Sequence, residues 1–207
     1  MKILAVSDEP IKWIYSATLR ERCKDVQLVV GCGDLPIWYM EFIASSLDAP
    51  CVYVRGNHDS FEIGESGKIK TDPGGWINLD MNVQTMAGLT MAGLQGCLRY
   101  KPDAPYQYSQ FEQTARGCLL SARLFTRQLT VKSFDLMVTH SPPFGIHNGA
   151  DHAHTGFKVF NRMMDTFKPR LWLHGHQHTN YAPRDATETL VGATKVMNVH
   201  PFRIIEI

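Results

Sequence analysis

Short apolar runs of strand type alternate with longer amphipathic segments through the first half of the chain. The runs KILAV at 2–6, VQLVV at 26–30 and CVYV at 51–54 have the length and composition of buried strands. The segments at 11–22 and 37–47 between them have the length and spacing of helices. Strands separated by helices indicate a βαβα arrangement, in which helices cover both faces of a sheet.

The second half keeps the same kinds of element in a less regular order. Residues 76–96 are typical of hairpin-connected strands, and residues 188–207 of two or three short strands. No repeat, low-complexity run or linker divides the sequence. We therefore expect a single domain over 1–207, of α/β class, with one mixed sheet or two packed sheets. The remaining predicted elements are helices at 109–129 and 157–167 and strands at 134–140 and 169–175.

Carboxylate, amide or imidazole side chains lie at the ends of five predicted strands, those at 2–6, 26–30, 51–54, 134–140 and 169–175. In open α/β sheets, ligands bind at the carboxyl edge of the strands, so we expect these side chains to converge on one crevice. A turn alone would explain the amide and carboxylates among them, but not the imidazoles. The residues are Asp8, Asp34, Asn57, His58, Asp59, His140, His176 and His178.

Carboxylate, amide and imidazole groups in one place suit a divalent transition metal such as manganese, iron or zinc. A set made only of oxygen ligands would instead have suited magnesium or calcium. Two metal ions about 3.5 to 4 Å apart, bridged by one carboxylate, are a usual device for in-line attack on phosphate esters. The carboxylate, amide and imidazole side chains named above therefore allow a two-metal site.

The charge balance shows no excess of basic residues of the kind that binds nucleic acid. Lys and Arg number 21 against 20 Asp and Glu, a net charge of +1, so long nucleic acid is not an expected partner. The five cysteines are odd in number and scattered, which indicates reduced packing residues. The N-terminal apolar run is too short for a signal peptide or a membrane span. We expect a cytoplasmic protein with no membrane partner.

The polar clusters match a known motif set in order and spacing. The chain resembles the calcineurin-like metallophosphoesterases, whose pattern is D-x-H, G-D, G-N-H-D/E, H and G-H-x-H. The matching stretches are Gly33-Asp34, Gly56-Asn57-His58-Asp59, His140 and Gly175-His176-Gln177-His178. The resemblance spans nearly the full length. It implies a four-layer α/β/β/α sandwich of two mixed sheets, and hydrolysis of a small phosphodiester or phosphomonoester by in-line attack of a metal-activated hydroxide.

The resemblance also implies a role for each matching residue. Asp34 would bridge two divalent transition metal ions (manganese, iron or zinc). Asp8 and His178 would hold the first ion, and the second would be held by Asn57, His140 and His176. His58 would stay off the metals and face the scissile phosphate, either stabilising charge or protonating the leaving oxygen. Asp59 would orient it.

The first motif departs from the family pattern, because Pro10 stands where the family has its second ligand, a histidine. Proline cannot bind a metal, so we expect the first site to be weaker than the second. Glu9, a water molecule or another side chain could complete it. Near the C-terminus, His200 either approaches the site or serves as a turn residue before the last strand.

Two further clusters are candidates for binding the substrate. Arg99, beside Tyr100, could clamp a phosphate through its planar guanidinium, or be a solvated loop charge. His154, or the backbone amides where the next helix begins, could do the same, with Thr155 as a helix cap in the simpler interpretation. Two other functions stay open: a catalytically weak or inactive binding protein with the same fold, and a nuclease.

Overall fold

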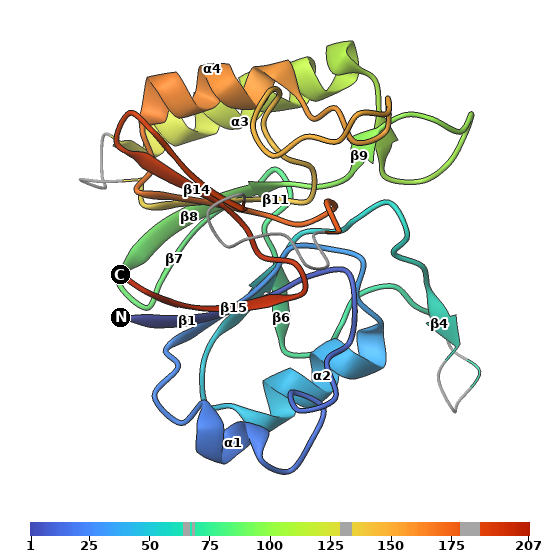
Figure 1. Ribbon diagram of the computed structural model, residues 1–207, viewed down its shortest axis with the longest axis vertical. Helices are drawn as coiled ribbons and strands as arrows, with labels where there is room; N and C mark the ends of the chain where they lie inside the picture. The colour runs from blue at the N-terminus through green and yellow to red at the C-terminus, as the bar shows by residue number, and fades with distance from the viewer. Residues whose placement is uncertain (64–66, 68, 129–133, 179–186) are drawn as a thin grey trace.

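Two β-sheets form the centre of the molecule. The computed structural model describes residues 1–63, 67, 69–128, 134–178 and 187–207 (Figure 1). In the first sheet β15 is antiparallel to β1, and all other neighbours are parallel. Its strands are, in spatial order, β15 (Phe202–Glu206), β1 (Lys2–Val6), β2 (Leu28–Gly31), β3 (Cys51–Tyr53) and β6 (Trp76–Asn78).

The second sheet has six strands and is also mixed. Its four central strands are parallel, while the edge strands β13 and β7 each pair antiparallel with the adjacent strand. The spatial order is β13 (Glu188–Val191), β14 (Thr194–Asn198), β12 (Leu171–His174), β11 (Leu136–Thr139), β8 (Leu89–Leu94) and β7 (Val83–Met86). Parallel neighbours need crossover connections, which explains why a helix separates β8 from β11 and β11 from β12 in the sequence.

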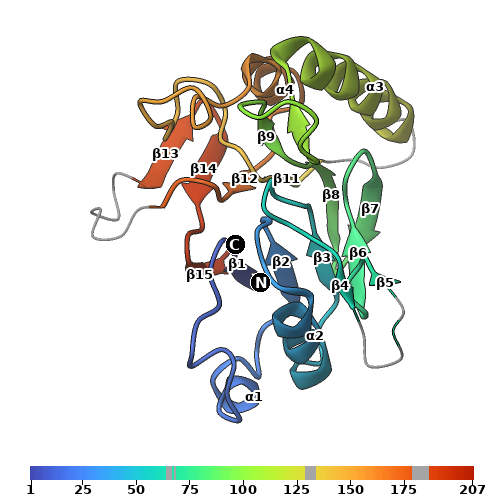
Figure 2. The same ribbon diagram turned by 90° about the vertical axis from the view of Figure 1, so that its right-hand side faces the viewer.

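Helices cover the outer face of each sheet (Figures 1 and 2). α1 (Leu19–Arg22) and α2 (Ile37–Ser46) lie against the five-stranded sheet, and α3 (Gln110–Gln128) and α4 (Lys158–Phe167) lie against the six-stranded sheet. The arrangement confirms the expected four-layer α/β/β/α sandwich. Among the described residues, no helix is both long and apolar enough to cross a membrane.

The apolar core is divided into three layers, which follow from the sheet faces. Val30, Val52 and Leu136 belong to the cluster between the two sheets. Trp172 and Phe160, both fully buried, belong to the cluster between the six-stranded sheet and its helices. Strands buried on both faces read as continuous apolar runs, which is why LMVT and LWLH are easily recognised as strands in the sequence.

The predicted helix at 11–22 is wrong over most of its length. Only α1 is helical, and the residues before it form turns. The Ser16 hydroxyl donates to the carbonyl of Trp13 at 2.6 Å and lies 2.9 Å from the Thr18 hydroxyl. Such side-chain bonds to the local backbone compete with helix formation, and the amphipathic spacing gave no sign of them.

The predicted hairpin region, 76–96, is divided between the two sheets. β7 and β8 form an antiparallel hairpin, whose turn has Ala87 at φ 49° and Gly88 at φ 78°. β6 instead joins the other sheet beside β3. Four two-residue strands were not predicted: β4 (Glu62–Ile63), β5 (Ile69–Lys70), β9 (Cys97–Leu98) and β10 (Gln107–Tyr108). Position 129, the last of the predicted helix 109–129, lies outside the described residues.

Candidate metal centre

The predicted polar side chains come together where the parallel strands of both sheets end. Asp8 follows β1, Asp34 lies beyond the end of β2, and Asn57 lies beyond the end of β3. From the other sheet, His140 directly follows β11 and His176 lies two residues after β12. Five segments distant in the sequence therefore supply one edge of the sandwich, as the sheet rule predicts.

The tightest part of the cluster comprises Asp34, His140 and His176, whose ligand-type atoms all lie within 4.8 Å of one another. His140 Nε2 lies 3.3 Å from Asp34 Oδ2 and 3.1 Å from Asn57 Oδ1. The other ring nitrogen, Nδ1, donates to the carbonyl of Cys32 at 2.7 Å. A carbonyl that fixes the ring in this way is the usual support of a metal-binding histidine, and it leaves Nε2 facing the two oxygens.

The electrostatics of this cluster favour a cation. Burial lowers the pKa of His140, but the charge and close contact of Asp34 outweigh it and raise that pKa to about 9. Burial and the neighbouring charge of His140 lower the pKa of His176 to about 3, so this ring is neutral at physiological pH. Its Nε2 donates to the carbonyl of Ala153 at 3.1 Å, which leaves Nδ1 as a lone-pair donor. A buried carboxylate, an amide oxygen and imidazole nitrogens fit a divalent transition metal.

Asp8 and His178 form a pair beside this cluster. His178 Nε2 lies 3.6 Å from Asp8 Oδ1, and the backbone N–H of His176 donates to both Asp8 oxygens at 3.1 Å. Burial acts to raise the pKa of Asp8, but His178 and the charge of His140 lower it to about 2. The Asp8 side chain is 1% exposed, whereas that of His178 is 61% exposed. The first pair of predicted ligands therefore consists of a buried carboxylate and a solvent-exposed imidazole.

The backbone is strained at three of the predicted ligands. Asp8, Asp34 and His176 have φ angles of 68°, 58° and 66°, in the left-handed region that non-glycine residues avoid. Such conformations cost about 1 to 3 kcal/mol each and concentrate at functional sites. Each strained residue stands in a loop after a strand, where the tight turn directs its side chain into the cluster.

The glycines of the motifs allow the loops to approach one another. A Cβ atom on Gly56 would lie 2.0 Å from Asp34 Oδ1, and one on Gly33 would lie 2.5 Å from the backbone nitrogen of Gly56. A Cβ atom on Gly175 would lie 1.8 Å from Ser7 Oγ and 2.6 Å from Asp8 Oδ2. A side chain at Gly56 or Gly175 would therefore displace a carboxylate, and one at Gly33 would push the Gly56 backbone away.

His58 and Asp59 have different surroundings although they are adjacent. His58 lines a hollow of about 470 Å³ together with Asp34 and His176, and its backbone N–H donates to Asp34 Oδ1 at 2.7 Å. The Asp59 carboxylate accepts hydrogen bonds from the backbone N–H groups of Leu35 at 3.1 Å and Gly56 at 2.8 Å. Burial and the charge of Asp34 raise the pKa of Asp59 to about 7. Among the described residues, its hydrogen bonds join two loops, and none reaches the His58 ring.

The two predicted substrate-binding residues lie in different places. His154 lines the same hollow as His58, stacks on His176 with ring centroids 4.6 Å apart, and contacts Asp151 at 2.7 Å. Arg99 lies instead in an adjoining pocket, where its Nη2 donates to Glu112 at 2.9 Å and to the carbonyl of Gln107 at 3.1 Å. His154 therefore joins the cluster, and Arg99 does not.

The comparison with protein-family models gives a match over most of the chain. The model of the calcineurin-like phosphoesterase family matches residues 1–180. The chain belongs to this family. It is therefore a hydrolase that acts on phosphoric ester bonds. A comparison with curated proteins finds no match.

Solved structures share the phosphoesterase fold at low sequence identity. The Thermus thermophilus protein TT1561 is 14% identical, with 96% of this chain and 88% of that chain covered and a TM-score of 0.58. The phosphopantetheinyl hydrolase PptH of Mycobacterium tuberculosis is 13% identical, with coverage of 96% and 88% and a TM-score of 0.52. GAP50, the anchor in the inner membrane complex of Plasmodium, is 12% identical, with coverage of 96% and 70% and a TM-score of 0.54. At these identities the likeness shows the fold alone.

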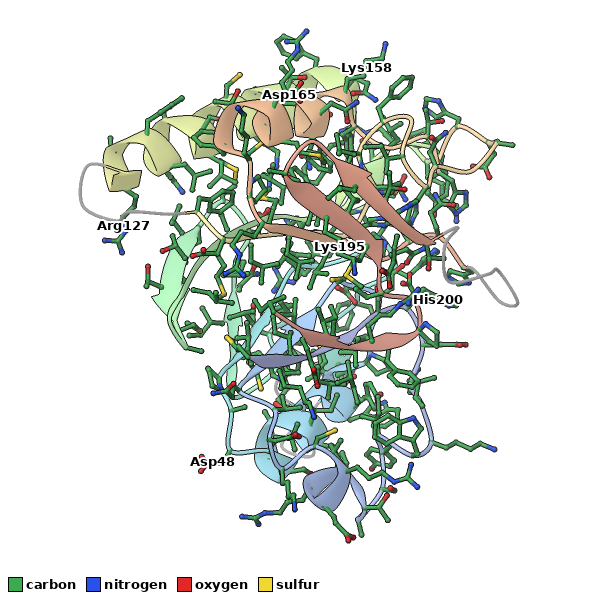
Figure 3. The ribbon with its side chains drawn as sticks, turned by 60° about the vertical axis from the view of Figure 1, so that its left-hand side comes forward. Asp48, Arg127, Lys158, Asp165, Lys195 and His200 are labelled. Atoms are coloured by element: carbon green, nitrogen blue, oxygen red, sulfur yellow. The ribbon has the colours of Figure 1, made fainter. Side chains whose placement is uncertain are left out.

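In this calcineurin-like phosphoesterase, His200 lies beside His178, one of the two residues predicted to hold the first metal ion. The His200 ring stacks on His178 with centroids 4.7 Å apart and planes at 12°, and it is buried. Its Nε2 lies 3.9 Å from Glu9 Oε1. Figure 3 shows His200, which lies in the loop between β14 and β15. His200 thus approaches the site, and Glu9 contacts His200.

Some residues of the phosphoesterase site had no signal in the sequence. The carbonyls of Cys32 and Ala153 hold the two imidazole rings, and a backbone carbonyl has no sequence signature. The Tyr100 hydroxyl accepts a hydrogen bond from Asn57 Nδ2 at 3.2 Å. Its position beside Arg99, a predicted substrate-binding residue, was the available hint, but nothing in the sequence paired it with Asn57.

Proposed function

We propose that this protein is a metal-dependent phosphoesterase that hydrolyses a small phosphodiester or phosphomonoester with two divalent transition metal ions, manganese, iron or zinc. The observation that carries the proposal is the convergence of Asp34, His140 and His176 within 4.8 Å at the edge where both sheets end. Bound ions would supply a hydroxide nucleophile at neutral pH and neutralise charge on the phosphate.

The residues divide into two ligand groups that share Asp34. Asn57, His140 and His176 would hold the second ion, supported by the short distances among their ligand atoms. Asp8 and His178 would hold the first ion together with Asp34. The greater exposure of His178 and the proline at position 10 support a weaker first site.

His58 would act on the substrate. Its side chain borders the hollow beside Asp34, from where an imidazole can stabilise charge or give a proton to the leaving oxygen. Asp59 supports it indirectly, because its carboxylate ties the loop containing Gly56 to the loop containing Leu35. Asp59 is therefore proposed as a positioning residue. His154, held by Asp151, would bind a phosphate oxygen from the opposite side.

The size and charge of the surroundings favour a small substrate. The hollow has a volume of about 470 Å³, and the whole chain has a net charge of +1, without the excess of basic residues that long nucleic acid requires. All five cysteines are free thiols, which supports a reducing, cytoplasmic environment.

Metal reconstitution followed by parallel assays on a nitrophenyl monoester and a nitrophenyl diester tests the proposal. The parent protein should hydrolyse at least one of them when loaded with manganese, iron or zinc, and Asp34→Asn should not. Activity on neither ester under any metal, with the ions bound, would favour a binding protein of the same fold. Activity on single-stranded DNA alone would favour a nuclease.

A further inference from the structure

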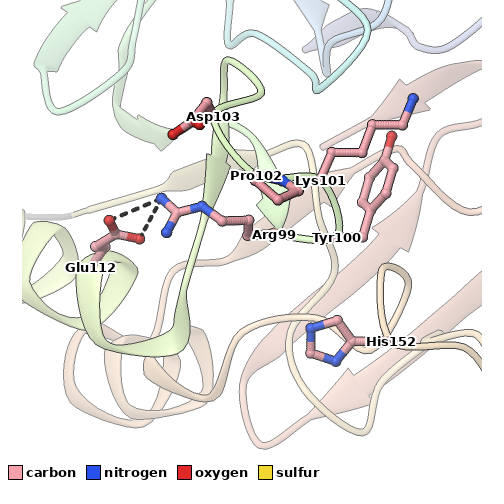
Figure 4. Close-up of a pocket in the computed structure, with 7 residues that line it drawn as sticks. All are labelled: Arg99, Tyr100, Lys101, Pro102, Asp103, Glu112 and His152. Carbon is pink, nitrogen blue, oxygen red and sulfur yellow. Dashed lines mark hydrogen bonds and ion pairs between the residues drawn. The ribbon is translucent and has the colours of Figure 1, made fainter.

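A second hollow, lined by Tyr100 next to Asn57 of the candidate metal centre, has no role in the mechanism proposed above. It has a volume of about 880 Å³, which is within the range of small-molecule sites. Figure 4 shows its lining, which comes mainly from the loop after β9. The residues are Arg99, Tyr100, Lys101, Pro102, Asp103, Glu112 and His152.

A hydrogen bond and a shared loop join this pocket to the metal centre. The Tyr100 hydroxyl, at the wall of the pocket, accepts from Asn57 Nδ2, and Asn57 Oδ1 faces His140. On the other side, His152 lines the pocket while Asp151 and His154 line the hollow beside the metal ligands. One loop, residues 151–154, therefore borders both spaces.

The charged groups of the pocket cancel one another. Arg99 donates to Glu112, and the dashed lines in Figure 4 show that its guanidinium is directed at that carboxylate. Lys101 and Asp103 add one charge of each sign. A lining with two cationic and two anionic side chains offers no net attraction to an additional phosphate. The pocket is thus unsuited to the phosphate itself and suited to an uncharged part of the substrate.

The remaining surface of the pocket consists of rings. Tyr100 is 38% exposed, and Lys101 Nζ lies 5.8 Å from the centroid of its ring. The rings of Pro102 and His152 also border the space (Figure 4). The aromatic faces of Tyr100 and His152 favour stacking with planar groups.

We propose that this pocket binds the leaving group of the substrate, and that the leaving group is an uncharged alcohol carrying a planar ring. This inference rests on the proposed function, because it places the phosphate beside Asp34 and His58. Tyr100 is then a specificity residue at the boundary, with its ring toward the leaving group and its hydroxyl on Asn57.

Binding of two phosphonates that are not hydrolysed tests the inference without any need for turnover. Phenylphosphonate and methylphosphonate are titrated calorimetrically into the manganese-loaded protein. We expect phenylphosphonate to bind about tenfold more tightly, since its ring gains the stacking surface. His152→Ala and Tyr100→Leu should each remove most of this advantage, and His152→Ala should leave methylphosphonate affinity and metal content unchanged. Tyr15→Leu, a change at a half-exposed tyrosine outside the pocket, should keep the full advantage.

The outcomes separate the two proposals. Equal affinities of the two phosphonates for the parent protein would overturn the leaving-group pocket and leave the proposed function intact. An advantage for phenylphosphonate that survives both pocket variants would also overturn it. If neither phosphonate binds the metal-loaded protein, the proposed function fails, and the pocket assignment fails with it.

Discussion

Substituting alanine for Gly56 should damage the metal centre without replacing any of the proposed ligands. The new Cβ would lie 2.0 Å from Asp34 Oδ1, 2.5 Å from Asp34 Cγ and 2.7 Å from His140 Cε1. Real contacts of Cβ atoms are essentially never shorter than 3.0 Å, so the carboxylate oxygen must move by at least 1.0 Å. It cannot move freely, because the backbone N–H of His58 holds it at 2.7 Å.

The size of the effect follows from that displacement. Metal ligands must keep their distances within about 0.2 Å, and even changes to the groups that support ligands reduce metal affinity by about 10- to 100-fold. If both proposed sites share Asp34, a shift of 1.0 Å in its carboxylate should lower the affinity for both metals by about 100-fold or more. Overpacking should also lower the free energy of unfolding by about 1 to 3 kcal/mol.

Gly93→Ala is the matched control for the loss of stability. Its Cβ would lie 2.6 Å from Val54 Cγ1 and 2.8 Å from Leu79 Cβ, in the core between the sheets. This variant should lose a similar amount of stability and keep the parent's metal affinity. Calorimetric manganese titration and denaturant unfolding measure the two quantities separately. Equal metal affinity in Gly56→Ala and the parent would refute the assigned position of Asp34.

Four other variants test individual roles. Asp34→Asn should reduce metal binding more than His140→Ala, because a bridging carboxylate serves two ions; in metal titrations, two tightly bound ions in Asp34→Asn would contradict the bridge. His58→Ala should reduce kcat by about 10²- to 10⁴-fold at unchanged metal content, with a smaller loss for nitrophenyl than for alkyl esters. Loss of a metal in His58→Ala would instead make it a ligand. His200→Ala should weaken the first site by about tenfold, because it removes the ring that stacks on His178, and leave the second site unchanged. Equal weakening of both sites, measured by metal titration, would count against this positioning role.

The general layout could be predicted because it depends on repeated, local patterns. The runs that became β1, β2, β3, β11 and β12 are apolar on both faces, as strands between two covering layers must be. The position of ligands after such strands follows from the geometry of parallel sheets. These two rules are enough to place Asp8, Asp34 and His140 at one edge from the sequence.

What could not be predicted depends on contacts between segments that are distant in the sequence. His200 stacks on His178 only because the loop before β15 is held beside β1, where the Ser7 N–H donates to the Pro201 carbonyl at 3.0 Å. Tyr100 meets Asn57 across 43 positions of the chain. Neither contact has a periodicity or a motif, so no sequence pattern indicates it.

The role of Asp59 also shows the difference between motif and geometry. The motif places this carboxylate next to His58, which suggested that it orients the ring. In the structure its oxygens bind the backbone N–H groups of Leu35 and Gly56. Adjacent residues on a tight turn direct their side chains differently, so sequence neighbourhood was a poor guide to contact.

Anomalous diffraction from crystals of the manganese-loaded protein tests the central claim most directly, because it locates the ions without relying on activity. The account predicts a strong peak among Asp34, Asn57, His140 and His176, and a weaker peak between Asp34, Asp8 and His178. Manganese that binds in solution but is absent from this edge of the sandwich would contradict the account. So would a peak at Asp8 and His178 that is stronger than the peak at Asn57, His140 and His176 when the metal is limiting.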